Sequence, residues 1–304
     1  MNSVIVEHII KTYGKKKEVT ALSDISFEVP QGELFGLIGP DGAGKTSLFR
    51  ILTTLLLADS GKAMVDGFEV VKDYKAIRQR VGYMPGRFSL YPDLSVEENL
   101  NFFATIFNTS IEENYDLIKD IYVQIEPFKT RRAGKLSGGM KQKLALSCAL
   151  IHRPSVLFLD EPTTGVDAVS RKEFWAMLKG LKQQGITILV STPYMDEASL
   201  CDKVALLQNG KILSIDTPAG IVNDFSNPLW AVKSSRMLPL LKELQKMEPV
   251  KDVYPFGEFH HVVLKDRSGE SVLKEFIRQK ENEQAVIKEI KPDIEDCFIA
   301  LMKN

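Results

Sequence analysis

The chain has 304 residues, a net charge of −1, a hydrophobic fraction of 44% and a charged fraction of 26%. At about 150 residues per domain this length predicts roughly two domains, and the composition excludes a mostly disordered chain. The near-neutral charge argues against a protein that binds nucleic acid through bulk positive charge, and the sequence has no run of about 18 apolar residues that would predict a transmembrane helix.

Strand patterns open the chain. Apolar residues alternate over Val4–Ile10 and again over Ala21–Val29, and the apolar run Glu33–Ile38 predicts a buried strand. Glycines follow this run, and a helical pattern then covers Thr46–Leu57. A buried strand, a glycine-rich turn and a helix are typical of the beginning of an α/β unit.

The middle of the chain is mostly helical in pattern. A further strand is predicted over Val81–Met84, and helices are predicted within residues 95–150. Ser95 and Glu98 have the spacing of a capping box, which marks the start of the first of these helices.

Strand signals then return. The runs Ser155–Leu159 and Ile186–Ser191 are apolar and rich in Val, Ile and Leu, as strands of a parallel sheet are. The dipeptide Asn209-Gly210 separates the strand-like runs Lys203–Gln208 and Lys211–Ser214, which predicts a two-residue hairpin.

The pattern changes again toward the end of the chain. Strand-like and helical runs alternate there, at Leu229–Val232, Met237–Met247, His260–Leu264 and Ser271–Gln279. We therefore expect an α/β domain over residues 1–222, with a helical subdomain over about residues 92–152, and a small α+β domain over residues 223–304.

The cysteines and a histidine pair show no metal or disulfide pattern. Cys148, Cys201 and Cys297 are far apart and odd in number, so we expect buried thiols in a reducing cytosol. His260 and His261 lie in a strand-like run without acidic or cysteine neighbours, so we expect a structural role for them.

The strongest chemical signal follows the third predicted strand. Residues 39–46 read GPDGAGKT, which matches the phosphate-binding loop GxxxxGK[ST] in its strand–loop–helix context. Glycines let the backbone wrap a phosphate chain, and the amides of the loop and of the helix N-terminus point at the anion. Lys45 supplies charge to the β- and γ-phosphates, and Thr46 offers a hydroxyl to Mg²⁺.

A pair of acids ends the strand run SVLFLDEP. Asp160 and Glu161 are expected at the carboxyl end of the sheet, where ligands bind in such folds. Asp160 is suited to holding Mg²⁺, and Glu161 to orienting or deprotonating an attacking water. The alternative is that the two acids only end a strand and have no chemical role. The phosphate loop upstream makes this alternative weaker.

A second phosphate surface is predicted near residue 137. Residues 136–143 read LSGGMKQK, with Ser137 at the start of a helical run. A helix N-terminus with a serine hydroxyl and bare glycine amides binds phosphate. One γ-phosphate does not need both surfaces within one chain, so the second is expected to serve another molecule.

Taken together, the motifs resemble those of ATP-binding subunits of ABC transporters. The phosphate loop, LSGGMKQ, LFLDEP and the GVD of residues 165–167 carry the resemblance, which covers about residues 3–220. The segments GYMPGRFSLYPDLSVEENL and STPYMDEA look most like bacterial drug-export subunits, and the ending DIEDCFIALM is similar to the tail of those subunits. The resemblance implies an α/β P-loop NTPase fold with a RecA-like core, an antiparallel β part, a helical subdomain and a small α+β C-terminal domain.

The resemblance also implies ligands and partners. In the family, two ATP-binding subunits pair head to tail, and each ATP lies between the phosphate loop of one chain and the LSGG signature of the other. ATP and Mg²⁺ are then the ligands, and the partners are membrane-spanning transporter subunits and a second ATP-binding subunit, not nucleic acid. The expected location is cytoplasmic, peripheral on the inner face of the cell membrane.

Site residues follow by position. Tyr13 matches the aromatic that stacks on adenine, and Asp160 with Thr46 matches the Mg²⁺ ligands. Glu161 matches the catalytic carboxylate, and Asp167 matches the loop that crosses the dimer interface. The nucleotide loop corresponds to Gly39, Asp41, Gly42, Ala43, Gly44, Lys45, Thr46 and Ser47, and the signature to Ser137, Gly138 and Gly139.

Three positions depart from the family pattern. Gly86 stands where the family usually has a Gln that contacts Mg²⁺ and water, and Pro193 stands where it usually has a His that contacts the γ-phosphate. Asp41 replaces the usual Asn and adds a negative charge near the phosphates. The loss of one contact of the kind that the Gln or the His makes costs about 2.7–4 kcal/mol of transition-state stabilisation. Arg87 is a candidate for compensation, but we expect it to be solvated.

The leading hypothesis is an ATPase motor subunit of an ABC exporter, paired with a second ATP-binding subunit as a homodimer or a heterodimer. The departures allow a second reading, in which this chain is the degenerate half of a heterodimer that binds ATP, hydrolyses it slowly and completes the partner's site. An ABC ATPase without a transport role and a module that senses ATP without turnover are further alternatives. Dependence of hydrolysis on Lys45 and Glu161 separates an ATPase from a sensor.

Overall fold

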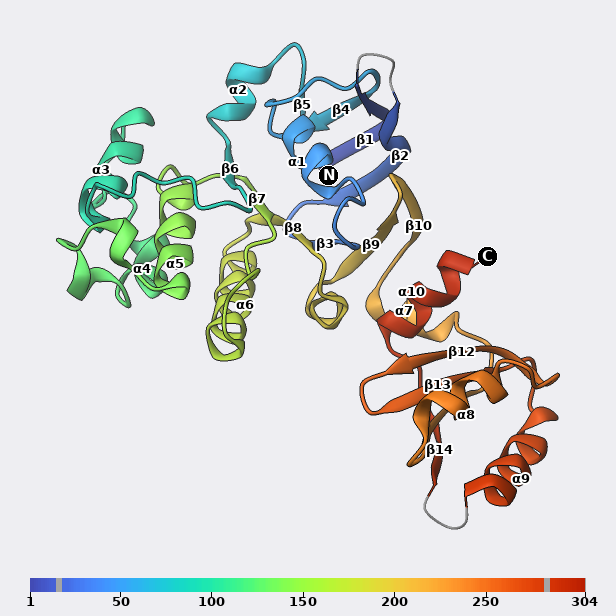
Figure 1. Ribbon diagram of the computed structural model, residues 1–304. Helices are drawn as coiled ribbons and strands as arrows, with labels where there is room; N and C mark the ends of the chain where they lie inside the picture. The colour runs from blue at the N-terminus through green and yellow to red at the C-terminus, as the bar shows by residue number, and fades with distance from the viewer. Residues whose placement is uncertain (15–17, 282–284, 304) are drawn as a thin grey trace. The chain divides into compact units, whose positions relative to one another are not determined.

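The chain folds into two compact units. In a computed structural model, which describes residues 1–14, 18–281 and 285–303, unit 1 comprises Met1–Ala219 and unit 2 comprises Gly220–Asn304 (Figure 1). The domain boundary expected between residues 222 and 223 lies within α7 (Pro218–Asn223).

Unit 1 is built on two sheets. Its strands are β1 (Asn2–Tyr13), β2 (Val19–Pro30), β3 (Leu34–Ile38), β4 (Ser60–Val65), β5 (Phe68–Glu69), β6 (Val81–Met84), β7 (Val156–Asp160), β8 (Thr187–Thr192), β9 (Lys203–Gln208) and β10 (Lys211–Asp216). The larger sheet has the order β10-β9-β3-β8-β7-β6 and is parallel except for β10, and an antiparallel sheet has the order β2-β1-β4-β5. Every residue of β3 and β7 is buried, as expected for parallel strands covered on both faces.

The first helix of unit 1 is shorter than predicted. Helix α1 (Lys45–Leu52) packs in a core shared by both sheets, but it ends five residues before Leu57. Thr54 takes a left-handed φ of 64°, and the backbone amides of Leu55 and Leu56 both bind the carbonyl of Arg50. The apolar run misled the prediction because its last leucines are not core residues: Leu57 is 65% exposed.

The predicted hairpin and capping box are confirmed. Asn209 and Gly210 join β9 to β10 with φ values of 49° and 73°, as a type I′ turn requires. The Ser95 amide donates to Glu98 Oε2 at 2.7 Å, and the Glu98 amide donates to Ser95 Oγ at 3.2 Å.

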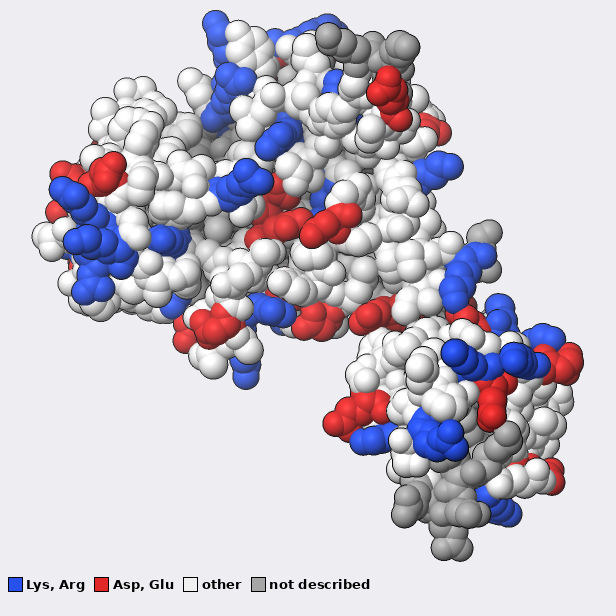
Figure 2. Space-filling view, in the orientation of Figure 1, with Lys and Arg blue, Asp and Glu red and all other residues white. Residues whose placement is uncertain are grey.

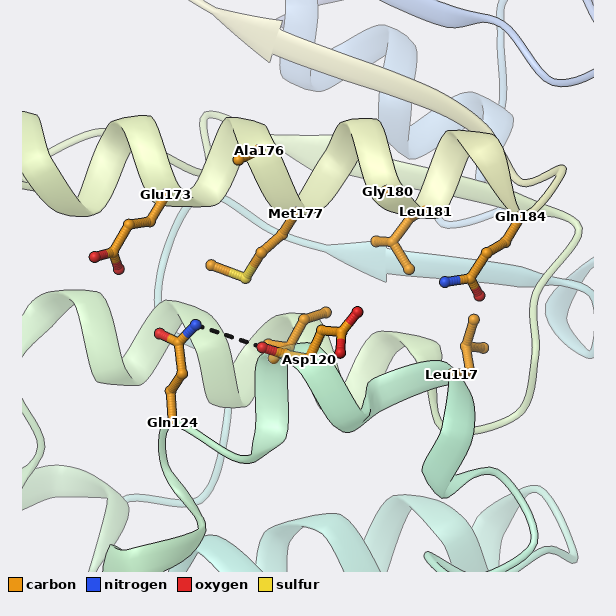
Figure 3. Close-up of a pocket in the computed structure, with 10 residues that line it drawn as sticks. Leu117, Asp120, Gln124, Glu173, Ala176, Met177, Gly180, Leu181 and Gln184 are labelled. Atoms are coloured by element: carbon orange, nitrogen blue, oxygen red, sulfur yellow. Dashed lines mark hydrogen bonds between the residues drawn. The ribbon is translucent and has the colours of Figure 1, made fainter.

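The sequence of unit 1 between β5 and β8 forms most of its helices. They are α2 (Tyr74–Arg78), α3 (Val96–Ile106), α4 (Tyr115–Tyr122), α5 (Gly138–Leu150) and α6 (Ala168–Gln183). Figure 3 shows a groove of about 320 Å³ between α4 and α6, with Leu117 on one side and Met177 and Leu181 on the other. At its rim, Lys143 of α5 donates to Glu173 Oε2 at 2.8 Å and also binds Gln124, so α5 and α6 are tied together.

Unit 2 has the β-α-β-β-α-β order of a split βαβ motif, followed by one more helix. Its elements are β11 (Leu229–Lys233), α8 (Met237–Leu244), β12 (Val250–Phe256), β13 (Phe259–Leu264), α9 (Gly269–Glu281), β14 (Val286–Ile290) and α10 (Ile294–Lys303). The antiparallel sheet has the order β12-β13-β11-β14. Helices α8 and α9 contribute Leu240, Leu244, Leu273 and Ile277 to its main core.

A polar contact holds α10 to this sheet. Asp296 is 1% exposed, and its Oδ1 atom lies 2.6 Å from His261 Nδ1 and accepts a hydrogen bond from Tyr254 Oη at 2.8 Å. His260 is also buried, with Nε2 2.8 Å from the carbonyl oxygen of Met237. These contacts agree with the structural role expected for both histidines.

The cysteine side chains are buried and unbonded to one another, as predicted. Cys148 and Cys201 lie in unit 1 and Cys297 lies on α10. Burial raises the pKa of the Cys297 thiol to about 12, so this thiol is unreactive as a nucleophile near neutral pH.

The contacts of Asp296 predict a strong dependence of unit 2 on this residue. Asp296→Ala leaves His261 and Tyr254 without their buried acceptor, and we expect it to destabilise unit 2 by about 3 kcal/mol. Hydrogen exchange of α10 and β13 is expected to accelerate while that of β3 is unchanged. Lys303→Ala on the same helix is the control, because it removes only an exposed ion pair with Asp252. Equal acceleration in both variants would contradict the anchoring role of Asp296.

Candidate functional site

Three motif-bearing segments meet at one edge of the parallel sheet. Ile38 pairs with Thr192, and Asp160 pairs with Ser191, so β3, β7 and β8 end side by side. The glycine-rich loop of residues 39–44 follows β3, and the acidic pair ends β7. Carboxyl ends of parallel strands are where ligands bind in open α/β sheets. In Figure 2 acidic side chains gather near the middle of unit 1, over the region where β7 and β8 are drawn in Figure 1.

Glycine is required in the loop for two different reasons. A Cβ atom on Gly39 would lie 2.1 Å from the carbonyl oxygen of Leu207, so the loop passes directly against β9. Gly42 has a φ of 79° and nothing within 4 Å of its Cβ position, so it faces open space. No side chain caps the N-terminus of α1, which begins at Lys45. The first amides of α1 are therefore suited to an anion.

Lys45 connects the loop to the acidic pair. Its side chain is 3% exposed, and Nζ donates to the carbonyl oxygens of Gly39 at 2.8 Å and Pro40 at 3.0 Å. Nζ also lies 3.2 Å from Glu161 Oε1. The structure thus brings together the loop lysine and the predicted catalytic carboxylate.

A serine that the sequence analysis missed holds the two acids. Ser191 Oγ donates to Asp160 Oδ1 at 2.6 Å and accepts from the Glu161 amide at 3.0 Å. Glu161 has a left-handed φ of 50°, which is a strained conformation for this residue and typical of functional sites. Burial, and then the charge of Asp160, raise the pKa of Tyr83 to about 12. The only signal for Ser191 was a small hydroxyl residue at the end of an apolar strand.

Tyr13 lies beside the loop from the antiparallel sheet. Its hydroxyl oxygen is 3.0 Å from Ser47 Oγ, directly after the phosphate loop, and the residue is 39% exposed. The ring is therefore near the loop and accessible to a ligand. Asp41 is exposed on the loop itself, as is Arg87 on its own segment.

The second predicted phosphate surface lies elsewhere in unit 1. Ser137 caps α5 and accepts from the Met140 amide at 3.3 Å, and both Ser137 and Gly138 are exposed. Figure 1 shows α5 and α1 in separate parts of unit 1. Within the described residues, no hydrogen bond or ion pair joins residues 137–139 to the loop of residues 39–47.

Asp167 lies at the exposed start of α6. Its Oδ1 accepts from the amides of Ser170 at 3.0 Å and Val169 at 3.1 Å. The hydrogen bond from Ser170 is the main reason that the pKa of Asp167 is lowered. A Cβ on Gly139 would lie 3.0 Å from Ser170 Oγ, so the signature helix and α6 approach closely. Val169, in the first turn of α6, is 70% exposed.

Two of the three departures from the family pattern, Gly86 and Pro193, lie at this edge. A Cβ on Gly86 would be 3.0 Å from the backbone oxygen of Asp160, so position 86 is next to the acidic pair. Pro193 follows Thr192, whose carbonyl accepts from the Gly39 amide at 3.2 Å. Both positions therefore adjoin the site, where neither residue supplies a polar side chain.

An apolar groove opens beside Gly86. It has a volume of about 930 Å³ and is lined by residues that include Tyr74, Tyr83, Pro85, Phe103 and Phe107. His152 stacks on Phe107 with ring centroids 3.8 Å apart, and burial lowers the pKa of His152 to about 4. The imidazole is therefore neutral at physiological pH, and the positive charge on the lining of the groove comes from Arg50, Lys75 and Arg78.

Comparisons with known proteins agree on one family. A sequence model described as "ABC transporter" matches residues 22–164. The probable multidrug ABC transporter ATP-binding protein YbhF of Escherichia coli is 38% identical over 287 residues, 93% of this chain and 49% of the relative, so the chain spans about half the length of that relative. The daunorubicin resistance ATP-binding protein DrrA2 of Streptomyces coeruleorubidus is 31% identical over 98% of this chain and 94% of its own length.

Solved structures show the same fold for unit 1. The dimeric post-hydrolysis structure of the ATP-binding cassette MJ0796 bound to ADP and Pi has a TM-score of 0.64. It is 24% identical and covers 70% of this chain and 98% of its own. This confirms the P-loop NTPase architecture of the ABC type that the resemblance implied.

The two loop glycines predict different costs of substitution. Gly39→Ala places a methyl group 2.1 Å from a backbone oxygen that cannot retreat without disturbing β9, so we expect a loss of about 3 kcal/mol or more. Gly42→Ala meets no atom and pays only for its positive φ, at about 1 kcal/mol. Scanning calorimetry of the two variants measures the difference, and equal costs would show that the loop does not pack on β9 as described.

Proposed function

The chain belongs to the family of ABC transporter ATP-binding proteins, and from that premise we propose that it is the ATP-binding and ATP-hydrolysing motor subunit of an ABC exporter. The observation that carries the proposal is the contact of Lys45 Nζ with Glu161 Oε1 at 3.2 Å. The contact places a cation suited to binding phosphate beside a carboxylate suited to activating water, at the sheet edge where ligands bind.

The contact suggests how binding prepares hydrolysis. The phosphates of ATP compete with Glu161 for the Lys45 ammonium, and the loop amides and the N-terminus of α1 bind the same phosphates. Glu161, released from Lys45, is then free to accept a proton from the water that attacks the γ-phosphate. Tyr13 provides an accessible ring for the adenine base.

Oxygen ligands for Mg²⁺ are available in the same place. Thr46 is the second residue of α1 and carries a hydroxyl, and the Asp160 carboxylate is fixed by Ser191. Mg²⁺ prefers hard oxygen donors of this kind. We propose that these two residues hold the ion, which would neutralise charge on the phosphate oxygens.

A second ATP-binding chain completes the site. Ser137 and Gly138 present an exposed helix N-terminus that does not contact the loop of residues 39–47 of the same chain. Asp167 and the exposed Val169 lie where α6 meets the signature helix. A head-to-tail dimer would cover Val169 and place each signature against the partner's nucleotide, as the dimeric form of MJ0796 supports.

Membrane-spanning subunits are the proposed transport partners. No helix among the described residues has the length and hydropathy needed to cross a bilayer. We propose that the apolar groove binds a helix of such a subunit, because aromatic side chains line it and its lining reaches Pro85, directly before Gly86. Two relatives are named as a probable multidrug ABC transporter ATP-binding protein and a daunorubicin resistance ATP-binding protein. We therefore propose drug-like compounds as the exported cargo and a peripheral location on the inner face of the cell membrane.

Two variants test the motor function. Lys45→Ala removes the ammonium from the phosphate loop, and we expect Mg-ATP affinity to fall by about tenfold or more. Glu161→Gln keeps the loop intact, so binding is expected to persist while turnover falls by about 10²–10⁴-fold. Equilibrium binding and phosphate release measure the two effects. A wild type that binds no Mg-ATP, or turns it over no faster than Lys45→Ala, would contradict the motor function.

Gly86 and Pro193 favour one alternative, the degenerate half of a heterodimeric pair. If this chain lacks turnover because Gly86 has no side chain, Gly86→Gln is expected to raise turnover by about tenfold over Gly86→Ala. The alanine variant is the matched control, since it adds the same Cβ 3.0 Å from the Asp160 oxygen without a polar group. Steady wild-type turnover that Gly86→Gln does not increase would favour the homodimer.

A further inference from the structure

A buried carboxylate near the site has a hydrogen-bond partner on only one of its two oxygens among the described residues. Glu197 lies in the short 3₁₀ helix Met195–Leu200 and is 1% exposed. Its Oε2 accepts from Thr192 Oγ1 at 2.6 Å. Its Oε1 has no hydrogen-bond partner within the part of the chain that the structure describes. A buried carboxylate oxygen left in this state carries a large desolvation cost.

Arg171 of α6 faces that oxygen. Its Nε is also buried without a hydrogen-bond partner among the described residues, and it lies 3.6 Å from Glu197 Oε1. This distance is too long for a hydrogen bond. A small approach of the two groups would satisfy both atoms at once and form a charge-assisted bond. A closed arrangement would therefore satisfy the two groups better than the open one that the structure shows.

The same guanidinium also holds the segment after β8. Its Cζ atom lies 4.4 Å from the ring centroid of Tyr194, and an Nη atom lies 3.6 Å from Asp196 Oδ2. The Tyr194 amide donates to Thr192 Oγ1 at 3.1 Å. Because Pro193 has no polar side chain, residues 192–197 are fixed by Thr192 and by Arg171 instead.

Thr192, which binds Glu197, and Arg171 are each hydrogen-bonded through the backbone to another part of the site. The carbonyl of Thr192 accepts from the Gly39 amide of the phosphate loop at 3.2 Å. The amide of Arg171 donates to the carbonyl of Asp167 at 2.9 Å, one turn from the start of α6. Arg171 is thus connected through Glu197 and Thr192 to the nucleotide loop, and through the backbone of α6 to the segment proposed to cross the dimer interface.

We propose that Arg171 is a positioning residue for ATP hydrolysis: it closes onto Glu197 when the nucleotide site fills, and so ties residues 192–197 to the helix that begins at Asp167. The inference rests on the proposed ATPase function. Arg171 is not one of the residues proposed above to bind the phosphates or the attacking water. Its removal should therefore slow turnover without weakening nucleotide binding.

The test compares kcat with Mg-ATP affinity. Arg171→Met keeps the length of the side chain and removes its charge, and we expect kcat to fall about tenfold with affinity unchanged. Glu197→Gln is expected to cause the same loss, because an amide oxygen still accepts from Thr192 but no longer attracts Arg171. The double variant should lose no more than either single variant, since both remove one contact.

Lys182→Met is the matched control. Lys182 lies at the other end of α6 and pairs with Asp202 at 2.6 Å, so the variant removes a more exposed ion pair of the same helix away from the site. Its kcat should equal that of the wild type. Unchanged kcat in Arg171→Met, additive losses in the double variant, or parallel losses of affinity and thermal stability would overturn the positioning role. A wild type without turnover above Lys45→Ala would instead remove the proposed ATPase function on which the role depends.

Discussion

The ammonium group of Lys45 is buried between two carbonyls of the glycine-rich loop and the carboxylate of Glu161. A buried charge of this kind persists only where its partners are fixed in place. Parallel pairing of β3 and β7 with β8 fixes them, because it brings the loop after one strand to the acids that end another. The rest of unit 1 keeps these strand ends together. The bent backbone at Glu161 and the hydrogen bonds of Ser191 are part of that arrangement.

Much of this site was readable from the sequence because its constraints are local. A Cβ atom at position 39 would lie 2.1 Å from the carbonyl oxygen of Leu207, so this position accepts only glycine and appears in the sequence as a motif position. The caps at Ser95 and Ser137 are equally local, since each side chain binds an amide three residues ahead. Strands β3 and β7 are buried on both faces and were visible as unbroken apolar runs.

What the sequence could not predict depends on partners far apart in the chain. Strands β12 and β14 escaped notice because they are the edges of their sheet and carry charged residues, with Pro255 in β12. Asp296 looks like a surface residue until His261 and Tyr254, 35 and 42 residues away, enclose it. The pair of Arg171 and Glu197 likewise belongs to no motif, and only the packing of α6 against the segment after β8 brings the two together.

Gly86 and Pro193 both fit the contacts around them without supplying a polar side chain. Position 86 adjoins the backbone of Asp160 so closely that a side chain there must displace it by a few tenths of an ångström, and the structure accommodates glycine without that strain. The segment after β8 is held by Thr192, Glu197 and Arg171, none of which requires a phosphate to be present. Arg171 of α6 contacts this segment from outside it, and α6 begins at Asp167, where the proposed second ATP-binding chain would make contact. A shift of α6 at that surface would therefore reach residues 192–197 through Arg171.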